Sequence, residues 1–492
     1  MTIAFTSIPV NLYVPGQYAE FSSANANQNQ VVTIPPGILL IGQMLATGTA
    51  AAGTVAQVTG ADQVGKLTGR GSMLHQMAKK LFGVTSFIPV YLLPLADAVT
   101  SVPSSIAATI SGPASASGEI DLYVGDTRYP IGVTLGDTPA VIATNLVAAV
   151  SADSDRYMDA VVDGTNTAKV NFTARNSGID AGKIIISTSR YFGESLPTGV
   201  GVAVAARVEG TLNPTVNAAV YATLGETWYP SFVMPYSDAA NLAALKVELA
   251  DRFGPLRQID AYNFIGVNDT VTNEMALATV DNSPWESLLD CGDMLTPPYV
   301  VAATVAAVDA VEPDPSRPRH TLALPGVLSI PDTGRRTLAQ RNQLLGAGFS
   351  TLRVLSDGTV EIERLVSSYR TNSYAVTDDA YFDRTTLSTL ANLRYTLRVR
   401  FATKYGRWKL GQDGTLGANV MTPSLATSEC IALYRDTWMV QGWVEGGDAV
   451  TQFKSQLQAA IDSGDPNRLD LQLPPNLING LDVLAAEIDF IR

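Results

Sequence analysis

Apolar and polar residues alternate at both ends of the 492-residue chain. The alternating apolar residues are Ile3, Phe5, Ile8 and Val10 near the start, and Ile488 and Phe490 near the end. Successive side chains of a β-strand point to opposite faces, so a period of two predicts a half-buried strand at each terminus. The pattern leaves open whether these strands close on their own domain or join the sheet of another subunit.

Between the ends, the pattern changes to strands that alternate with helices. Residues 37–45 and 87–95 are apolar runs of the kind found in buried strands. The segment between them, residues 72–82, spaces its apolar residues as a helix does. These residues are Leu74, Met77, Ala78 and Leu81. A strand, a helix and a strand at this spacing indicate a βαβ unit.

The same pattern returns in the middle of the chain. Apolar runs at residues 228–236 and 260–267 predict strands, and residues 237–254 between them predict a helix. Asp238 is a suitable N-cap for this helix, and Gly254 followed by a proline is a suitable stop. Further helical patterns follow before residue 311. We therefore expect a parallel or mixed sheet flanked by helices.

The composition shifts after the first βαβ unit. Residues 101–119 are rich in Ser, Ala, Gly and Pro, as expected at a domain boundary. Short strand-like runs separated by turn sequences follow, and one helical stretch, residues 138–150, interrupts them. This pattern predicts a β-rich domain, residues 105–212, inserted into the α/β domain.

The overall composition predicts a folded protein with few surface charges. Hydrophobic residues make up 46% of the chain, and charged residues only 16%, against roughly 25% in an average protein. A large surface with few charges favours a subunit of a long-lived assembly. The net charge of −13 argues against direct nucleic-acid binding, because phosphate contacts need clustered Lys and Arg.

Two cysteines are too few for a disulfide framework and predict reduced thiols. The N-terminus lacks the basic and apolar regions of a signal peptide. The longest apolar run, residues 299–308, is far shorter than the roughly 20 residues that span a bilayer. We therefore expect a soluble protein, made in the cytosol and not inserted into a membrane.

Charge is distributed unevenly along the chain. Residues 215–315 hold 14 acidic and 3 basic residues, whereas residues 316–410 hold 7 acidic and 15 basic residues. Residues 411–492 are acidic again, with 11 acidic and 4 basic residues. Either these blocks fold against one another within one molecule, or they form complementary faces on identical subunits.

Residues 385–410, in the basic block, predict a long helix with six cations and no acid. Its apolar stripe contains Leu390, Leu397, Phe401 and Trp408. At about 100° per residue, Arg400, Lys404 and Arg407 follow one flank of this stripe. Arg398 and Lys409 follow the other flank. The cations form a solvated face, meet an acidic partner protein, or meet the acidic face of residues 215–315 on an adjacent subunit.

The sequence offers little for catalysis. A Ser-His-Asp triad would need one of the two histidines, His75 or His320, and neither has metal ligands at suitable spacing. The chain contains no nucleophile elbow, no phosphate-binding loop and no complete dinucleotide-binding motif. Carboxylate pairs such as Asp378 and Asp379 occupy ordinary loop positions. We expect no enzyme activity, no metal and no cofactor.

Four long stretches resemble one protein family. Residues 314–372, which begin DPSRPRHTLALPG, and residues 8–21, 389–415 and 465–492 resemble the Mu-type contractile tail sheath proteins of bacteriophages. The resemblance covers most of the chain outside the inserted β-rich domain. The inserted domain is similar, though less closely, to the protruding domain of some sheath proteins.

The resemblance implies a multidomain α/β (α+β) fold with a subtilisin-like core that lacks protease activity. The implied domains are an N-terminal β-arm and linker (1–25), the first part of the α/β body (26–104), the inserted protruding domain (105–212), the subtilisin-like domain (213–345), an inner domain facing the tail tube (346–480) and a C-terminal β-arm (481–492). The scarcity of histidine agrees with the loss of protease activity.

The resemblance also implies partners. Sheath subunits stack as six-fold helical rings around a tube, with baseplate and tail terminator proteins at the ends, and are assembled in the host cytoplasm into the virion. On triggering, the stack shortens and drives the tube through the host envelope. The terminal strands would pair with neighbouring subunits by β-strand addition. The residues implied to face the tube or an adjacent subunit are Arg398, Arg400, Lys404 and Arg407.

Two other functions remain open from the sequence. The first is a sheath subunit of a contractile injection system that is not a phage. The second is a degenerate subtilisin-like hydrolase, in which His75 or His320 would lie beside a serine nucleophile.

Overall fold

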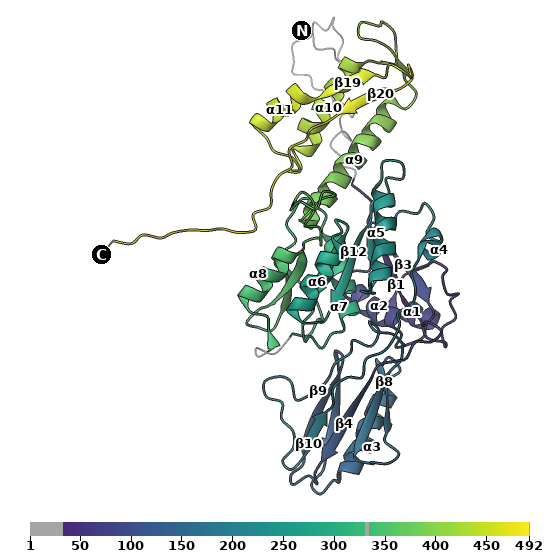
Figure 1. The fold of residues 1–492 in the computed structure, drawn as a ribbon, viewed down its shortest axis with the longest axis vertical. Coiled ribbons are helices and arrows are strands. Elements are labelled where there is room, and N and C mark those ends of the chain that lie inside the picture. The colour runs from purple at the N-terminus through teal and green to yellow at the C-terminus, as the bar shows by residue number, and fades with distance from the viewer. Residues whose placement is uncertain (1–32, 330–333, 492) are drawn as a thin grey trace, which may run out of the picture. The chain divides into compact units, whose positions relative to one another are not determined.

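The computed structural model describes residues 33–329 and 334–491, which form two compact units (Figure 1). The body unit contains Pro35–Ser388 and the C-terminal segment from Gly480. The small unit contains Thr389–Asn479 and the described N-terminal residues Thr33 and Ile34. The N-terminal residues that the sequence predicts as a strand, Ile3 to Val10, lie outside the described residues.

A nine-stranded sheet forms the centre of the body unit. In spatial order its strands are β14 (Leu322–Ala323), β16 (Val360–Arg364), β15 (Phe349–Val354), β13 (Glu286–Asp290), β12 (Tyr262–Val267), β11 (Ser231–Val233), β1 (Ile38–Gln43), β3 (Val90–Leu95) and β2 (Ala56–Val58). The six strands from β15 to β3 run parallel, and antiparallel strands lie at both edges. Every residue of β1 is buried, as expected for a parallel strand covered on both faces.

Helices cover this sheet in two contacting groups. In the first group, α2 (Met73–Val84) packs on α7 (Pro298–Val311), and both contact β1. The second group contains α5 (Ala239–Phe253), α6 (Val271–Asp281) and α8 (Leu338–Ala347), which contact one another in that order. Two short helices, α1 (Ala61–Thr68) and α4 (Ala218–Ala222), complete the set. Nearly all of the Ala- and Val-rich α7 is buried, which fits a helix that is apolar on every side.

Local sequence signals determine where these helices begin and end and which of their faces is buried. The Asp238 side chain accepts a hydrogen bond from the Asn241 backbone N–H and caps α5, as predicted. Gly254 ends the same helix. In α2 the apolar positions Leu74, Met77 and Leu81 are buried, so the predicted βαβ unit is confirmed.

Two small antiparallel sheets and one helix occupy the chain between β3 and α4. One sheet contains β10 (Gly201–Val204), β4 (Ser105–Ser111), β8 (Lys169–Ala174) and β7 (Met158–Val162). The other contains β6 (Thr127–Val133), β5 (Gly118–Val124) and β9 (Ile186–Thr188), and the helix is α3 (Pro139–Ala152). We call this part the inserted segment.

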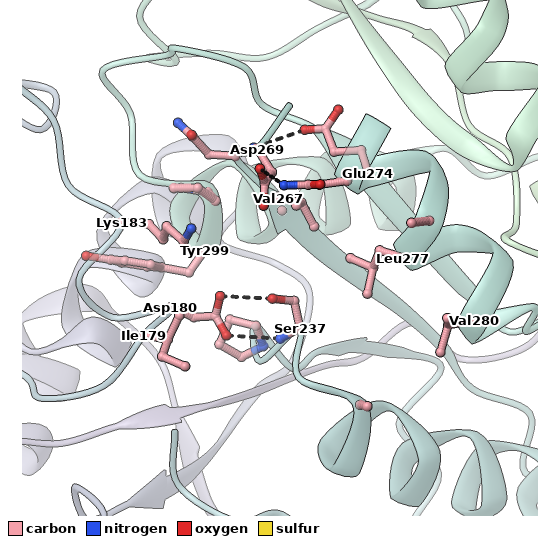
Figure 2. A pocket seen from close by; sticks show the side chains of 17 residues that line it. Ile179, Asp180, Lys183, Ser237, Val267, Asp269, Glu274, Leu277, Val280 and Tyr299 are labelled. Carbon is pink, nitrogen blue, oxygen red and sulfur yellow. Dashed lines mark hydrogen bonds between the residues drawn. The ribbon is translucent and has the colours of Figure 1, made fainter. Parts of the chain in front are cut away.

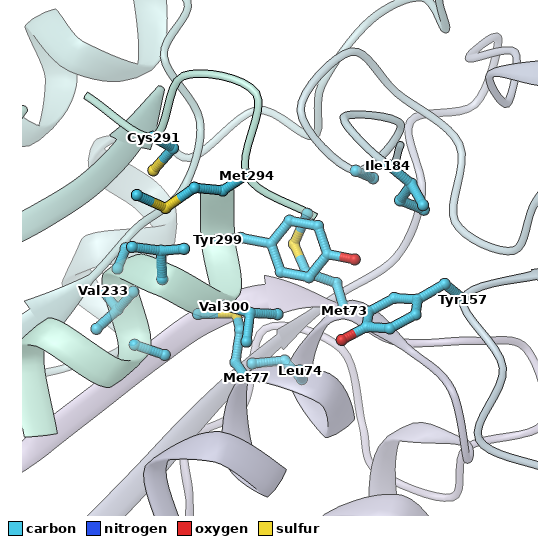
Figure 3. Close-up of a cluster of buried hydrophobic side chains, with 14 of the residues drawn as sticks. Met73, Leu74, Met77, Tyr157, Ile184, Val233, Cys291, Met294, Tyr299 and Val300 are labelled. Atoms are coloured by element: carbon cyan, nitrogen blue, oxygen red, sulfur yellow. The ribbon is translucent and has the colours of Figure 1, made fainter. Parts of the chain in front are cut away.

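The inserted segment shares its hydrophobic core with the large sheet (Figure 3). Tyr157 and Ile184 of the inserted segment lie in one buried cluster with Met73 of α2 and Tyr299 of α7. Ion pairs border this cluster. The Asp155 carboxylate lies 2.7 Å from the Arg70 guanidinium and 3.3 Å from the Lys79 ammonium. The Asp126 carboxylate lies 2.7 Å from the Lys80 ammonium.

The small unit is built around its own core. Its elements are most of α9 (Arg384–Tyr405), β17 (Lys409–Leu410), β18 (Val420–Met421), α10 (Pro423–Leu433), a π-helix over Tyr434–Trp438, α11 (Asp448–Gln456), β19 (Gln458–Ile461) and β20 (Leu469–Gln472). Leu393 of α9 packs with Trp438 and Phe453 in this core, and Leu397 and Phe401 pack against it.

One expectation needs correction. The predicted helix 385–410 ends at Tyr405, so Trp408 is not part of its apolar stripe and instead contacts the Tyr405 ring edge-on at 4.7 Å. The small unit begins at Thr389, and β15 and β16 pair within the large sheet of the body. Residues 481–491 are exposed and form no strand in the single chain, so their pairing with a neighbouring subunit stays a prediction. Among the described residues, no helix is long and apolar enough to cross a bilayer.

Candidate functional site

The C-terminal segment presents unburied apolar side chains. Ile488 is 86% exposed and Phe490 is 81% exposed, although such side chains are usually buried. The others on this segment are Leu481, Val483, Leu484 and Ile491. Its root is fixed within the body unit, where the Asp482 carboxylate lies 3.0 Å from the Arg364 guanidinium. Beyond this contact the apolar residues face solvent in the single chain.

The hairpin of β19 and β20 is a two-stranded sheet in the small unit. Its four residue pairs extend from Gln458 opposite Gln472 to Ile461 opposite Leu469. The described residues place no third strand beside either edge of it. Helix α10 packs against β19 and supports the hairpin. A two-stranded hairpin is marginally stable by itself, and its open edges can accept further strands.

Two of the four cations predicted on α9 converge on one carboxylate. Arg400 donates to Glu429 of α10, and the Lys404 ammonium lies 2.9 Å from the same oxygen. The Tyr405 hydroxyl donates to the other oxygen at 2.7 Å. Partial burial alone would raise the pKa of Glu429, but the hydrogen bonds from these three groups lower it to about 2. Glu429 therefore stays ionised and ties α10 to α9.

The other two predicted cations face outward. Arg398 is exposed and its guanidinium lies 5.6 Å from the centre of the Tyr395 ring. Arg407 is exposed after the end of α9. The sequence did not indicate Glu429 as a partner, because Glu429 lies on a different helix, and only the packing of α10 brings it to α9. The structure therefore separates Arg400 and Lys404, which contact Glu429 although Lys404 is itself 44% exposed, from the exposed Arg398 and Arg407.

A groove of about 470 Å³ lies where the parallel strands β11 and β12 end (Figure 2). In α/β proteins this end of the sheet is the usual place for ligands. Its polar lining includes Asp180, which accepts hydrogen bonds from the backbone and the hydroxyl of Ser237 at 3.0 Å. Glu274 lies at the start of α6, where burial and the nearby charge of Asp290 raise its pKa to about 9.

Neither histidine lines this groove. His75 is buried in α2, where its Nδ1 accepts a hydrogen bond from the Gly71 backbone at 3.0 Å, and burial lowers its pKa. The neighbouring Ser72 caps the helix by accepting from the His75 backbone. His320 is half-buried in the loop that precedes β14. In the described part of the chain no group of His, Cys, Asp and Glu side chains could hold a metal ion.

Comparison with known proteins identifies the family. The family described as phage tail sheath protein central domain matches residues 209–368. The Mu-like prophage FluMu tail sheath protein of Haemophilus influenzae is 33% identical over 500 residues, which cover 100% of both chains.

Two solved structures are similar at lower identity. The sheath tail protein of Desulfitobacterium hafniense has 13% identity and a TM-score of 0.46, covering 94% of this chain and 100% of that one. The contracted helical sheath of the anti-feeding prophage has 11% identity and a TM-score of 0.47, covering 98% of this chain and 99% of that one. From the full-length match to the prophage protein, the chain belongs to the phage tail sheath family.

Proposed function

We propose that the chain polymerises as stacked six-fold rings around a tail tube and that contraction of this stack drives the tube through the host envelope. Membership of the tail sheath family supports this function. The observation that carries the proposal is the C-terminal segment, whose apolar residues have no cover in the single chain. Such a segment fits a subunit that becomes complete only in an assembly.

The terminal arms are proposed to link the subunits by strand exchange. A segment that alternates Ile488 and Phe490 with acidic residues has the period of a half-buried strand, but a strand needs a hydrogen-bonded neighbour. We propose the β19–β20 hairpin of an adjacent subunit as that neighbour, because both of its edges are open among the described residues. The N-terminal arm, with Ile3, Phe5, Ile8 and Val10, would use the second edge. Main-chain hydrogen bonds would then join subunits that still rotate against one another.

The small unit is proposed to face the tail tube. Arg398 and Arg407 would contact acidic groups of the tube protein, while Arg400 and Lys404 act through Glu429 to keep α9 in place. The basic block of the chain supports an acidic partner, since opposite potentials set register and speed association. An acidic face of a neighbouring subunit remains the second candidate for this contact.

The remaining parts would have structural roles. The body is proposed to be a subtilisin-like α/β domain without protease activity, and the inserted segment to be a protruding domain. Contraction would use the energy difference between two subunit lattices, with no nucleotide or cofactor. Assembly would take place in the host cytoplasm, with baseplate and terminator proteins at the ends.

The alternative functions have less support. A degenerate hydrolase would need a histidine in the groove at the ends of β11 and β12, and both histidines lie elsewhere. A non-phage injection system shares the sheath architecture, but the full-length match is to a prophage tail protein.

Removal of the last eight residues, 485–492, tests the proposal. Purified full-length chain is expected to form long striated cylinders in negative-stain micrographs, and the truncated chain is expected to remain as monomers or short oligomers. The double substitution Ile488→Asn and Phe490→Asn should act like the truncation, because it removes the apolar face of the arm. Ala485→Ser is the matched control and should assemble normally. Normal cylinders from the truncated chain would contradict strand exchange.

A further inference from the structure

The C-terminal arm leaves the body unit at one ionic contact. Asp482 and Arg364 are 3.0 Å apart, and their side chains are only 23% and 29% exposed. Arg364 is the last residue of β16, on the antiparallel side of the large sheet. Two residues before Asp482, Gly480 approaches Pro318 so closely that an added Cβ would lie 2.8 Å from the proline ring. The Asp482 side chain and the Gly480 backbone therefore contact the body, whereas Leu481 between them and the residues that follow are exposed.

Arg364 has a second carboxylate partner. Asp383 accepts hydrogen bonds from the Arg364 guanidinium at 2.8 and 3.1 Å, and the same guanidinium lies 5.3 Å from the Phe382 ring. Breaking a partly buried ion pair usually leaves a charge without a partner, which is costly. Here Arg364 keeps Asp383 and Phe382 when Asp482 departs, so the departure leaves no unpaired charge on the body.

The charges around Arg364 also favour the departure of Asp482. Burial raises the pKa of Asp383, and the negative charges of Asp482 and Asp379 raise it further, whereas Arg364 lowers it. Two carboxylates thus share the Arg364 guanidinium, and the negative charge of each one weakens the ion pair that the other forms with it. Asp482 is the one of the two that belongs to an exposed segment, so it is the group that can leave.

We propose that Asp482 and Arg364 form a releasable clasp that sets the free length of the C-terminal arm. This inference deepens the proposed strand exchange and rests on it. With the clasp closed, the nine residues Val483–Ile491 reach at most about 30 Å. With the clasp open, the free segment begins after Ile478, whose backbone N–H donates to the Trp443 carbonyl of the small unit at 3.2 Å. Four further residues then add about 14 Å of reach. One arm can therefore link neighbours at two different spacings.

The test uses the purified, unassembled full-length chain. Asp482→Asn removes the charge but keeps the shape, and is expected to raise hydrogen–deuterium exchange in residues 479–482 about two- to fivefold, the range for a modest ion pair. Asp482→Glu keeps the charge and should restore the slow exchange. High salt should raise exchange in the wild type but not in Asp482→Asn. Asp62→Asn, which removes an exposed partner of Arg70, is the control and should leave this segment unchanged.

The outcomes separate the clasp from the strand exchange. Equal exchange in wild type and Asp482→Asn, or a Glu variant that behaves like the Asn variant, would overturn the clasp. The truncation of residues 485–492 leaves Asp482 in place and tests the exchange alone. In assembly assays, the Asp482→Asn variant should still form cylinders. The critical concentration for its assembly should differ from that of the wild type, because the variant lacks the ionic contact with Arg364. An unchanged critical concentration would also overturn the proposal.

Discussion

Asp309 shows how a single residue connects two distant parts of the body unit. It lies near the end of α7, where its carboxylate accepts from Arg319 at 2.7 Å and from Arg384 at 3.0 Å. Arg384 is the first residue of α9, and its guanidinium lies 4.3 Å from the Tyr262 ring. Burial alone would raise the pKa of Asp309, but the two guanidinium groups lower it. The first turn of α9 is therefore anchored in the core of the body.

Asp309→Asn should destabilise the body by about 3 kcal/mol, because it leaves two nearly buried guanidinium groups without their carboxylate. Chemical denaturation followed by tryptophan fluorescence measures this change. Asp251→Asn removes an exposed partner of Arg257 and should cost less than about 0.5 kcal/mol. Equal stabilities of the two variants would refute the anchor.

The four cations predicted on the long helix, Arg398, Arg400, Lys404 and Arg407, show what the sequence could and could not predict for single residues. The sequence showed which cations share a flank of the helix, because helical spacing depends only on positions along the chain. It could not show that Arg400 and Lys404 share Glu429, since that contact depends on how α10 packs. Clustered charge indicated which cations lie near one another but not which groups they contact.

At the scale of elements, apolar patterning was sufficient for the parallel strands and the helices around them. Segments such as residues 37–45 and 72–82 are buried in the way their pattern indicates. The pattern could not show that β15 joins the sheet through β13, a pairing between segments far apart in sequence. The predicted end of the long helix was wrong, since Trp408 has the right spacing but follows Gly406, where α9 has already ended.

Glu429 gives a prediction for the pairing of α9 with α10. Glu429→Gln should destabilise the small unit by about 1–2 kcal/mol, since three donors lose a charged acceptor. The folded pKa of about 2 lies below the ordinary value of 4.5. The contribution is therefore present above about pH 4.5 and is lost as the pH falls toward 2.

Urea denaturation of the Glu429→Gln variant and the wild type across this pH range measures the effect. The difference between the two should be largest at neutral pH and should shrink in acid. Asp436→Asn, an exposed position in the π-helix, is the control. A difference that does not depend on pH would argue against an ionised Glu429 as the source.

At the scale of the whole molecule, the uneven charge distribution predicts how the chain would recognise the proposed tail tube. The double substitution Arg398→Glu and Arg407→Glu should prevent decoration of purified tubes, because it places negative charge on the surface proposed to meet acidic groups. Electron microscopy of mixtures of sheath and tube measures decoration, and circular dichroism checks the fold.

The control for this surface is the pair Lys66→Glu and Arg317→Glu, which changes the net charge equally at exposed positions of the body unit. These variants should decorate tubes, with decoration by the wild type weakening as salt is raised. Normal decoration by the Arg398→Glu, Arg407→Glu protein would direct attention to the acidic face of a neighbouring subunit.

The shared core beneath the inserted segment has a mechanical consequence. Because Tyr157 and Ile184 are packed with α2 and α7, and Asp155 and Asp126 are paired with cations of the body, this segment is expected to move with the body as one unit. A rotation of the subunit during the proposed contraction would then turn the inserted segment by the same angle. A fluorophore on a cysteine placed at Leu135, which is 65% exposed in the turn between β6 and α3, would report this rotation in real time.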